Sequence, residues 1–83
     1  MLRYDVIGAR IRTFRKKSGY TQEQLAMTIS SSTAYVSNIE HGIKKPSQQK
    51  LAQIAEAFGV TVDDLISAGD HIMTTEFPAN QKT

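Results

Sequence analysis

The apolar residues of this chain recur every three or four positions, which is the spacing of one face of an α-helix. The pattern repeats in five short segments, and no segment alternates apolar and polar residues as a half-buried β-strand would. We therefore expect five short helices and no sheet. The residues that define their apolar faces are Ile7, Ile11 and Phe14; Leu25, Ala26 and Ile29; Val36 and Ile39; Leu51, Ile54, Ala55 and Phe58; and Val62, Leu65 and Ile66.

Residues typical of helix ends separate these segments. Asp5 is a candidate N-cap of the first helix, and the letters TQEQ form a capping box that starts the second helix, from Thr21 to Gln24. Thr61 and Asp64 stand at the same spacing, with Asp in place of Glu or Gln. The third helix should span about residues 33–41. The remaining signals are Ser47 as an N-cap and Gly19, Gly42 and Gly59 as helix ends.

Three consecutive serines, Ser30, Ser31 and Ser32, lie between the second and third expected helices. A serine run can be a flexible linker, but the capping box before it and the apolar pair after it favour a tight turn. In that case Ser32 caps the third helix. Two short helices joined by such a turn form the helix-turn-helix pattern, in which the second helix enters the major groove of DNA.

The sequence resembles the phage-repressor and Cro type of helix-turn-helix domain. The matching segments are RIRTFRKKSGYTQEQLA, YVSNIEHG and KKPSQQKLAQIAEAFGVTVDDLI, and the match covers about residues 5–68. Small members of the family include phage repressors, controller proteins of restriction–modification systems and some antitoxins. The resemblance implies an all-α, compact five-helix, lambda-repressor-like domain over residues 1–68. It leaves residues 69–83 as a polar tail, partly disordered or contributing to dimer contacts.

The chain departs from the family pattern within the turn itself. Family members usually have glycine where this chain has Ser30 and an apolar residue where it has Ser31. Glycine suits that position because the turn needs a residue that tolerates a positive φ. Ser30 must therefore adopt this conformation at some cost, or the turn is rearranged. A serine in place of an apolar residue at position 31 should loosen the contact between the turn and the core.

The third helix carries the residues that the resemblance places toward base edges. Asparagine can bond adenine with two hydrogen bonds, serine and threonine can bond several bases, and alanine can contact a thymine methyl group. Because no arginine stands among them, we expect a weak preference for A·T-rich half-sites. The alternative is that they are solvated residues of a surface helix. The residues are Ser32, Thr33, Ala34, Ser37 and Asn38.

A second group of residues is expected to contact the DNA backbone. Gln22 begins the second helix, and the resemblance gives its side chain and backbone N–H a phosphate, which the positive end of a helix also favours. Tyr35 is equally compatible with a phosphate contact and with packing. The basic loop after the third helix and the first helix supply the cations. The full set is Gln22, Tyr35, Lys44, Lys45 and Arg10, with Arg12 beside it.

The resemblance assigns a structural role to Arg15 and Glu40. It pairs them in a partly buried ion pair that joins the first helix to the end of the third. A pair of this kind is weak evidence for stability, but it can fix the orientation of two elements. Loss of one partner should therefore cost more than replacement of both.

Charge is distributed unevenly along the chain. Residues 1–50 carry nine basic and three acidic side chains, a net charge of +6, whereas residues 51–83 carry one basic and five acidic side chains, a net charge of −4. A basic half suggests a polyanion partner, although a solvated surface with scattered charge would give the same numbers. With 83 residues and 40% hydrophobic content, the chain fits a single globular domain.

The chain lacks the residues that several classes of protein require. The chain has no cysteine, and His41 and His71 stand far apart, so we expect no metal site or cofactor. No nucleophile–base spacing, glycine-rich phosphate loop or carboxylate pair indicates an enzyme, and nothing indicates a small-molecule ligand. No apolar run suggests a membrane span or a signal peptide, which favours a cytoplasmic protein. His41, at the end of the expected third helix, is a further candidate for a DNA contact.

These observations predict a sequence-specific regulator of transcription, a repressor or controller, that binds double-stranded DNA. One such helix contacts only a few base pairs, so we expect a homodimer on a two-fold operator with half-sites about 34 Å apart. The expected interface is the fifth helix, at Val62, Leu65 and Ile66. The alternative is an antitoxin-type or adaptor protein that uses the same fold mainly for protein–protein interaction.

Overall fold

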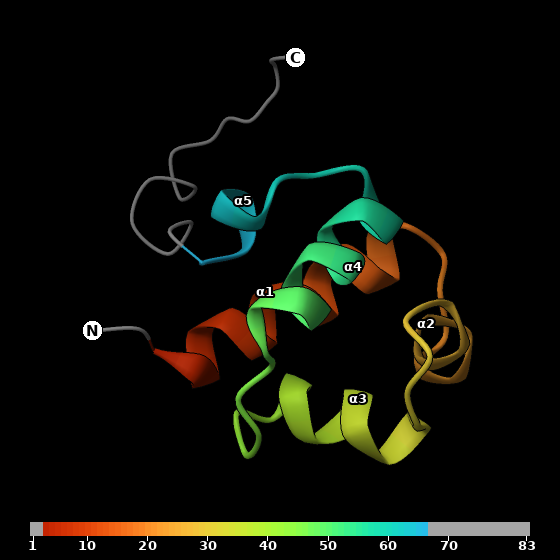
Figure 1. Ribbon diagram of the computed structural model, residues 1–83, viewed down its shortest axis with the longest axis horizontal. Helices are drawn as coiled ribbons and strands as arrows, with labels where there is room; N and C mark the ends of the chain where they lie inside the picture. The colour runs from red at the N-terminus through yellow and green to blue at the C-terminus, as the bar shows by residue number, and fades with distance from the viewer. Residues whose placement is uncertain (1–2, 67–83) are drawn as a thin grey trace.

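Five helices form the structure, and they occur in the expected order (Figure 1). Figure 1 shows a computed structural model, which describes residues 3–66. No strand occurs within that range, so the expectation of an all-α fold is confirmed. The helices are α1 (Tyr4–Lys17), α2 (Gln22–Thr28), α3 (Thr33–Glu40), α4 (Gln48–Phe58) and α5 (Val62–Ile66).

The core is built from the apolar faces that the sequence pattern defines. All five helices contribute to it, and its largest fully buried side chains are isoleucines, leucines and a valine. Two aromatic residues from those faces lie at its edge instead: Phe14 and Phe58 are half-buried and stack with 6.2 Å between ring centroids. The buried residues are Ile7, Ile11, Leu25, Ala26, Ile29, Val36, Ile39, Leu51, Ile54, Ala55 and Leu65.

The helix α3 packs against both α1 and α2, while α5 packs against α1 and α4. In Figure 1, α3 lies along the lower edge of the molecule, and α5 lies above α4 on the opposite side. Gly8 permits the close crossing of α1 and α3, because a Cβ atom there would lie 2.2 Å from the carbonyl oxygen of Ile39. This packing leaves one side of α3 facing outward.

Side-chain caps begin four of the five helices, as the sequence predicts. Thr21 Oγ1 accepts from the Gln24 N–H at 3.0 Å, and Gln24 Oε1 accepts from the Thr21 N–H at 2.9 Å. The Thr61 and Asp64 pair makes the same two bonds, both at 3.0 Å. Ser32 and Ser47 cap α3 and α4 through their hydroxyl oxygens.

The start of α1 differs from the expectation. The helix begins at Tyr4, so Arg3 occupies the N-cap position and Asp5 lies inside the first turn. The Asp5 carboxylate accepts hydrogen bonds from the Arg3 guanidinium, and this contact is the main cause that lowers the pKa of Asp5. A carboxylate in the first turn still suits the positive end of the helix. The expected N-cap at Asp5 is therefore wrong by position, although the residue does lie at the helix start.

The predicted domain boundary and tail, residues 69–83, lie outside the described residues. Within the described part of the chain, no helix combines the length and the apolar character that crossing a membrane requires.

Candidate nucleic-acid interface

The turn between α2 and α3 has the conformation that Ser30 was expected to supply. Ser30 has φ = 56°, and it is the one non-glycine residue with positive φ in the described range. The Ser31 N–H donates to the carbonyl of Ala26 at 2.8 Å, and the Ser30 N–H donates to the carbonyl of Met27 at 3.2 Å. These two bonds close α2 in a Schellman motif, in which glycine usually occupies the left-handed position.

The turn is also held from α4, by a contact that the sequence did not reveal. The ammonium group of Lys50 donates to the carbonyl of Ile29, the residue at the C-terminal end of α2. A cation at this position suits the negative end of the helix and satisfies a carbonyl that has no partner within α2. Lys50 lies 21 positions from Ile29, so no local sequence signal could have identified the pair.

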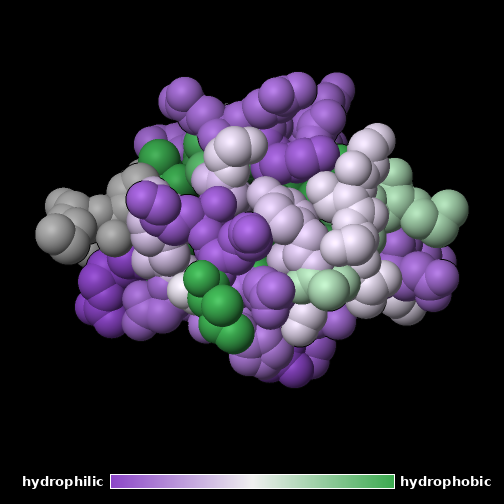
Figure 2. Space-filling view, turned by 60° about the horizontal axis from the view of Figure 1, so that its bottom comes forward, coloured by the Kyte–Doolittle hydropathy of each residue, from purple (hydrophilic) through white to green (hydrophobic). Residues whose placement is uncertain are grey.

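The outward side of α3 carries the five residues expected to contact bases. Ser32, Thr33 and Ala34 are exposed, and Ser37 and Asn38 are partly exposed, whereas Val36 and Ile39 on the opposite side are buried. Figure 2 shows this side of the molecule, where the surface is mainly hydrophilic or neutral and its apolar areas are small and separate. A polar helix side that projects from the fold can enter a groove without loss of core contacts.

Two of the expected phosphate contacts come from residues whose side chains already have partners. The Gln22 side-chain amide donates to Glu40 Oε1 at 3.0 Å. Gln22 is the first residue of α2, so its backbone N–H has no acceptor within the helix and remains suited to an anion. The ring of Tyr35 is half-buried and packs against the core, which is the packing role that the sequence left open.

The basic loop after α3 carries Lys44 and Lys45, and both are exposed. The Lys45 ammonium lies over the ring of Tyr4, 5.6 Å from its centroid, which links this loop to the start of α1. The Lys44 N–H donates to the carbonyl of Asn38 at 3.2 Å. The loop therefore follows directly from the end of α3 and holds two cations beside its outward side.

Arg10 occupies a different part of the molecule. Its Nε donates to the carbonyl of Asp64 at 3.0 Å, and its guanidinium lies 5.6 Å from the centroid of the Phe14 ring. Burial lowers the pKa of Arg10, although attraction to Asp64 opposes the shift. Arg10 therefore joins α1 to α5, on the side of α1 that does not contact α3.

The structure brings Arg15 and Glu40 together. Arg15 Nε lies 2.6 Å from Glu40 Oε2, and the two side chains are 9% and 1% exposed. Arg15 also donates to the carbonyl of Tyr20 at 2.9 Å, and Glu40 accepts from Gln22. Both carboxylate oxygens of Glu40 and most N–H groups of Arg15 therefore have partners, as a buried ion pair requires. Through these bonds the pair joins the ends of α1 and α3 to the start of α2.

The three residues expected at a dimer interface differ in exposure. Leu65 is 1% exposed and packs inside the hydrophobic core. Val62 and Ile66 are partly buried at the edge of that core. The apolar pattern of the sequence could not distinguish a core residue from an interface residue, because one helix turn can face both the core and a partner.

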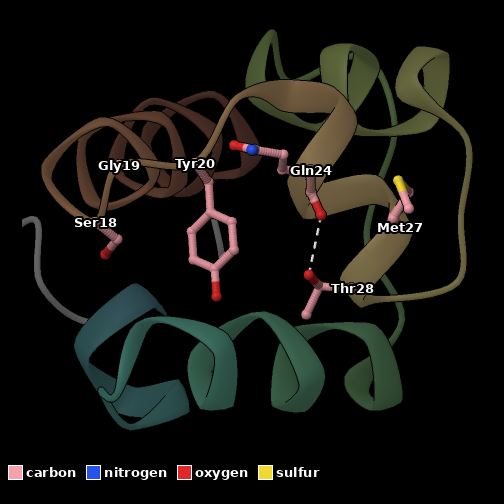
Figure 3. A pocket seen from close by; sticks show the side chains of 6 residues that line it. All are labelled: Ser18, Gly19, Tyr20, Gln24, Met27 and Thr28. Carbon is pink, nitrogen blue, oxygen red and sulfur yellow. Dashed lines mark hydrogen bonds between the residues drawn. The ribbon is translucent and has the colours of Figure 1, made fainter.

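Two shallow grooves lie beside the helices. One, of about 390 Å³, is lined by Ser18, Gly19, Tyr20, Gln24, Met27 and Thr28. In Figure 3 the Tyr20 ring points from the α1–α2 turn toward α4, and the Thr28 hydroxyl donates to the backbone carbonyl of Gln24 at 2.9 Å. The groove has no charged side chain.

Residues 3–66 contain no group of three or more His, Asp or Glu side chains that could hold a metal ion.

Sequence reasoning also missed Ile43. It is 74% exposed and lies in the basic loop between Gly42 and Lys44. The sequence signal that could have identified it is an isoleucine that lies outside the apolar face of every expected helix.

Comparison with known proteins identifies the same helix-turn-helix arrangement that the structure shows at α2 and α3. A helix-turn-helix family model matches residues 11–65. The uncharacterized HTH-type transcriptional regulator YazB of Bacillus subtilis is 36% identical over 61 residues, which cover 74% of this chain and 88% of YazB. Several other curated relatives are longer, and this chain spans between 15% and 60% of their length.

Solved structures of other regulators share the fold. The clp gene regulator ClgR from Corynebacterium glutamicum aligns with a TM-score of 0.73 at 35% identity, over 78% of this chain and 83% of ClgR. SinR, the master regulator for biofilm formation, solved in complex with DNA, aligns with a TM-score of 0.67 at 35% identity, over 71% of this chain and 95% of that one. These relatives are regulators rather than enzymes. The chain therefore belongs to the helix-turn-helix family of DNA-binding transcriptional regulators, of the phage-repressor and Cro type.

Proposed function

We propose that this protein binds double-stranded DNA at specific sequences, as a homodimer on a two-fold operator, and regulates transcription by occupying that site. The observation that carries the proposal is the polar outward side of α3, which projects from the core beside a loop with two lysines. The SinR structure in complex with DNA supports it, because that protein shares the fold at 35% identity.

In this proposal α3 lies in the major groove, and its first turns contact the bases. Asn38 and Thr33 supply hydrogen bonds, Ala34 supplies an apolar contact, and each good bidentate pair discriminates against the wrong base by about 1–3 kcal/mol. Ser32 has a double role, because its oxygen caps α3 while its hydroxyl hydrogen stays available to a base. Ser37 completes the group one turn from Thr33.

Backbone contacts then fix the position of α3. The Gln22 N–H, at the start of α2, and the ammonium groups of Lys44 and Lys45 are the donors in the proposal. Each neutralised phosphate changes the slope of log K against log salt by about −0.9. Arg10 is a weaker candidate, because its guanidinium already bonds α5.

The dimer contact in this proposal is the outer edge of α5, at Val62 and Ile66. Leu65 is assigned to the protomer core instead, where its burial leaves no surface for a partner. Two-fold pairing would place the two copies of α3 about one DNA turn apart, roughly 34 Å. Because the relatives act on bacterial genes, we place the protein in the cytoplasm, where the chromosome lies.

Selection of bound sequences from a random duplex pool tests the base contacts. The wild-type protein should select a two-fold site, and Asn38→Ala and Thr33→Ala should each relax the preference at particular positions. Thr13→Ala, on the exposed side of α1, is the matched control and should select the wild-type site. An unchanged site in both α3 variants would overturn the assignment of these residues.

Salt and sedimentation test the rest of the proposal. Affinity for the selected duplex should fall steeply between about 50 and 200 mM salt. Failure to bind any duplex at about 50 mM salt would favour an adaptor instead. Sedimentation should show a dimer on the operator, and monomers alone, with and without DNA at high protein concentration, would exclude the two-fold model.

A further inference from the structure

His41 directly follows α3, where it occupies the C-cap position and is exposed. It stands four residues after Ser37 and seven after Ala34, so it continues their side of α3 by one further turn. Its ring nitrogen Nδ1 lies 2.8 Å from the carbonyl oxygen of Ser37. The imidazole is thus turned back along the side of α3 that is proposed to face DNA.

This contact determines which nitrogen carries the proton in the neutral ring. A carbonyl oxygen only accepts hydrogen bonds, so Nδ1 must be the donor. A neutral imidazole has one N–H, and Nε2 is consequently an acceptor. Two acceptors repel each other, so the neutral ring of His41 offers nothing to a phosphate oxygen through Nε2.

A second proton changes the ring without disturbing its position. It binds at Nε2, which leaves the bond from Nδ1 to the Ser37 carbonyl intact. The protonated ring then presents an N–H donor and a positive charge at the negative end of α3. Histidine is the side chain that makes this change between pH 5 and 8.

The charged groups around His41 come from three elements. Glu40 precedes it, but this carboxylate is buried and bonded to Arg15 and Gln22. Asp5 of α1 lies against Gly42 and is paired with Arg3 at 3.0 Å. The cations are Arg12 and Lys16 of α1, which line a groove with Glu40, and Lys44 and Lys45 of the following loop. These cations favour an anion at this end of α3, and the DNA phosphates are the anions that the proposed function supplies.

We infer that His41 is a phosphate contact of the DNA complex that forms only when its imidazole ring is protonated. The inference rests on the proposed function. It adds that each protomer takes up one proton, at Nε2 of His41, as DNA binds. Phosphate is preferred over a base edge because the first residues of such a helix lie deepest in the groove, and its C-terminal end lies toward the backbone.

Measurement of the affinity for a selected duplex at pH 6 and pH 8 tests this inference with the full chain. One additional neutralised phosphate strengthens binding roughly tenfold at about 0.1 M salt, so the affinity of the wild-type dimer should rise by roughly that factor for each of its two protomers on acidification. The salt slope should steepen by about 0.9 per protomer over the same change. A duplex of the same length with a scrambled sequence should gain equally, since a phosphate contact carries no base preference. A gain confined to the selected duplex would overturn the phosphate assignment in favour of a base contact.

Three variants locate the effect. His41→Asn should bind with little dependence on pH, and His41→Lys, with a permanent charge, should bind tightly at both pH values. His71→Asn is the matched control, because it removes the other histidine of the chain and should keep the wild-type response. A full pH response in His41→Asn would overturn the inference, whatever His71→Asn shows.

Nitrogen NMR of the DNA-free protein at pH 8 tests the hydrogen bond by itself. The Nδ1–H tautomer of His41 is expected, and the Nε2–H tautomer would contradict the geometry on which the inference depends. These outcomes are separate from the proposed function. If the wild-type protein binds its duplex equally well at pH 6 and pH 8, only the role of His41 fails, whereas absence of binding at both values removes the proposed function too.

Discussion

The two ends of α3 are joined to the fold by turns of the same hydrogen-bond pattern but of different residues. At the N-terminal end, Ser30 has φ = 56° and is exposed. At the C-terminal end, Gly42 has φ = 76° and its N–H donates to the carbonyl of Ile39, while the Ile43 N–H donates to that of Asn38. Both turns are Schellman motifs, so the same backbone geometry has been made with and without glycine.

The surroundings explain the difference. A Cβ atom on Gly42 would lie 2.8 Å from the Asp5 Cα, so the start of α1 excludes any side chain there. Glycine at this end therefore serves both the backbone angle and the packing. Gly19 and Gly59 have open space where a Cβ would be, so they serve only the angle. The turn at Ser30 belongs to this second, more permissive kind, because its residue is exposed.

The contacts that hold the two ends of α3 also differ, and the C-terminal end is again the more constrained. The C-terminal end of α3 is held to α1 by the buried pair of Arg15 and Glu40. The N-terminal end follows a turn that Lys50 holds through one backbone carbonyl. The C-terminal end of α3 is therefore fixed by a buried ion pair, whereas the turn at its N-terminal end accepts a strained residue.

The largest expected effect is at the anchor of the C-terminal end. Glu40→Ala should destabilise the protein by about 3–5 kcal/mol, because the Arg15 charge then remains buried without its partner. The double variant Arg15→Met with Glu40→Leu should recover most of that loss. Urea unfolding followed by circular dichroism measures both. A loss below about 1 kcal/mol in Glu40→Ala would mean that the pair does not hold α3.

A smaller effect is expected at Gly42. Gly42→Ala should cost about 3 kcal/mol, since the left-handed angle costs an alanine about 1–2 kcal/mol and the contact with Asp5 adds overpacking. Gly19→Ala is the matched control, with the same kind of φ but open space, and should cost about 1 kcal/mol. Equal losses in the two variants, measured by thermal unfolding, would remove packing as the distinction between the two ends.

The smallest effect is expected at the other end, and it has the opposite sign. Ser30→Gly should stabilise the protein by about 0.5–1 kcal/mol, because relief of the left-handed strain exceeds the additional entropy that glycine loses on folding. Ser31→Gly should instead destabilise it by about 0.5–1 kcal/mol, because Ser31 has no positive φ. A shift of Tm in the same direction for both variants would show that strain at Ser30 is negligible.

Most of the fold could be predicted from the sequence because its signals are local. Capping boxes at Thr21 and Thr61 need only residues three positions apart, and the apolar stripes need only one helix. The N-cap of α1 was placed two residues late, at Asp5 instead of Arg3, because Asp5 has a competing local partner in Arg3. That competition is decided by side-chain geometry, which the letters alone do not contain.

The candidate site divides in the same way. The resemblance located the outward residues of α3 because helical spacing determines which positions share a side of the helix. It did not show that the Gln22 side chain bonds Glu40, that Arg10 bonds α5, or that Leu65 is inside the core. Each of these depends on elements that are far apart in the sequence.

Caps, glycines and apolar spacing were enough to predict the five helices and the starts of four of them, because these signals act over three to seven residues. The family was identified separately, from the resemblance of whole segments. The contacts that hold α3 in place, and the availability of its polar groups, became known only from the packed helices. Lys50 reaches Ile29, Glu40 reaches Arg15, and Gln22 reaches Glu40. Bonds of this kind form only after packing has fixed the distances between helices and the rotamers of their side chains.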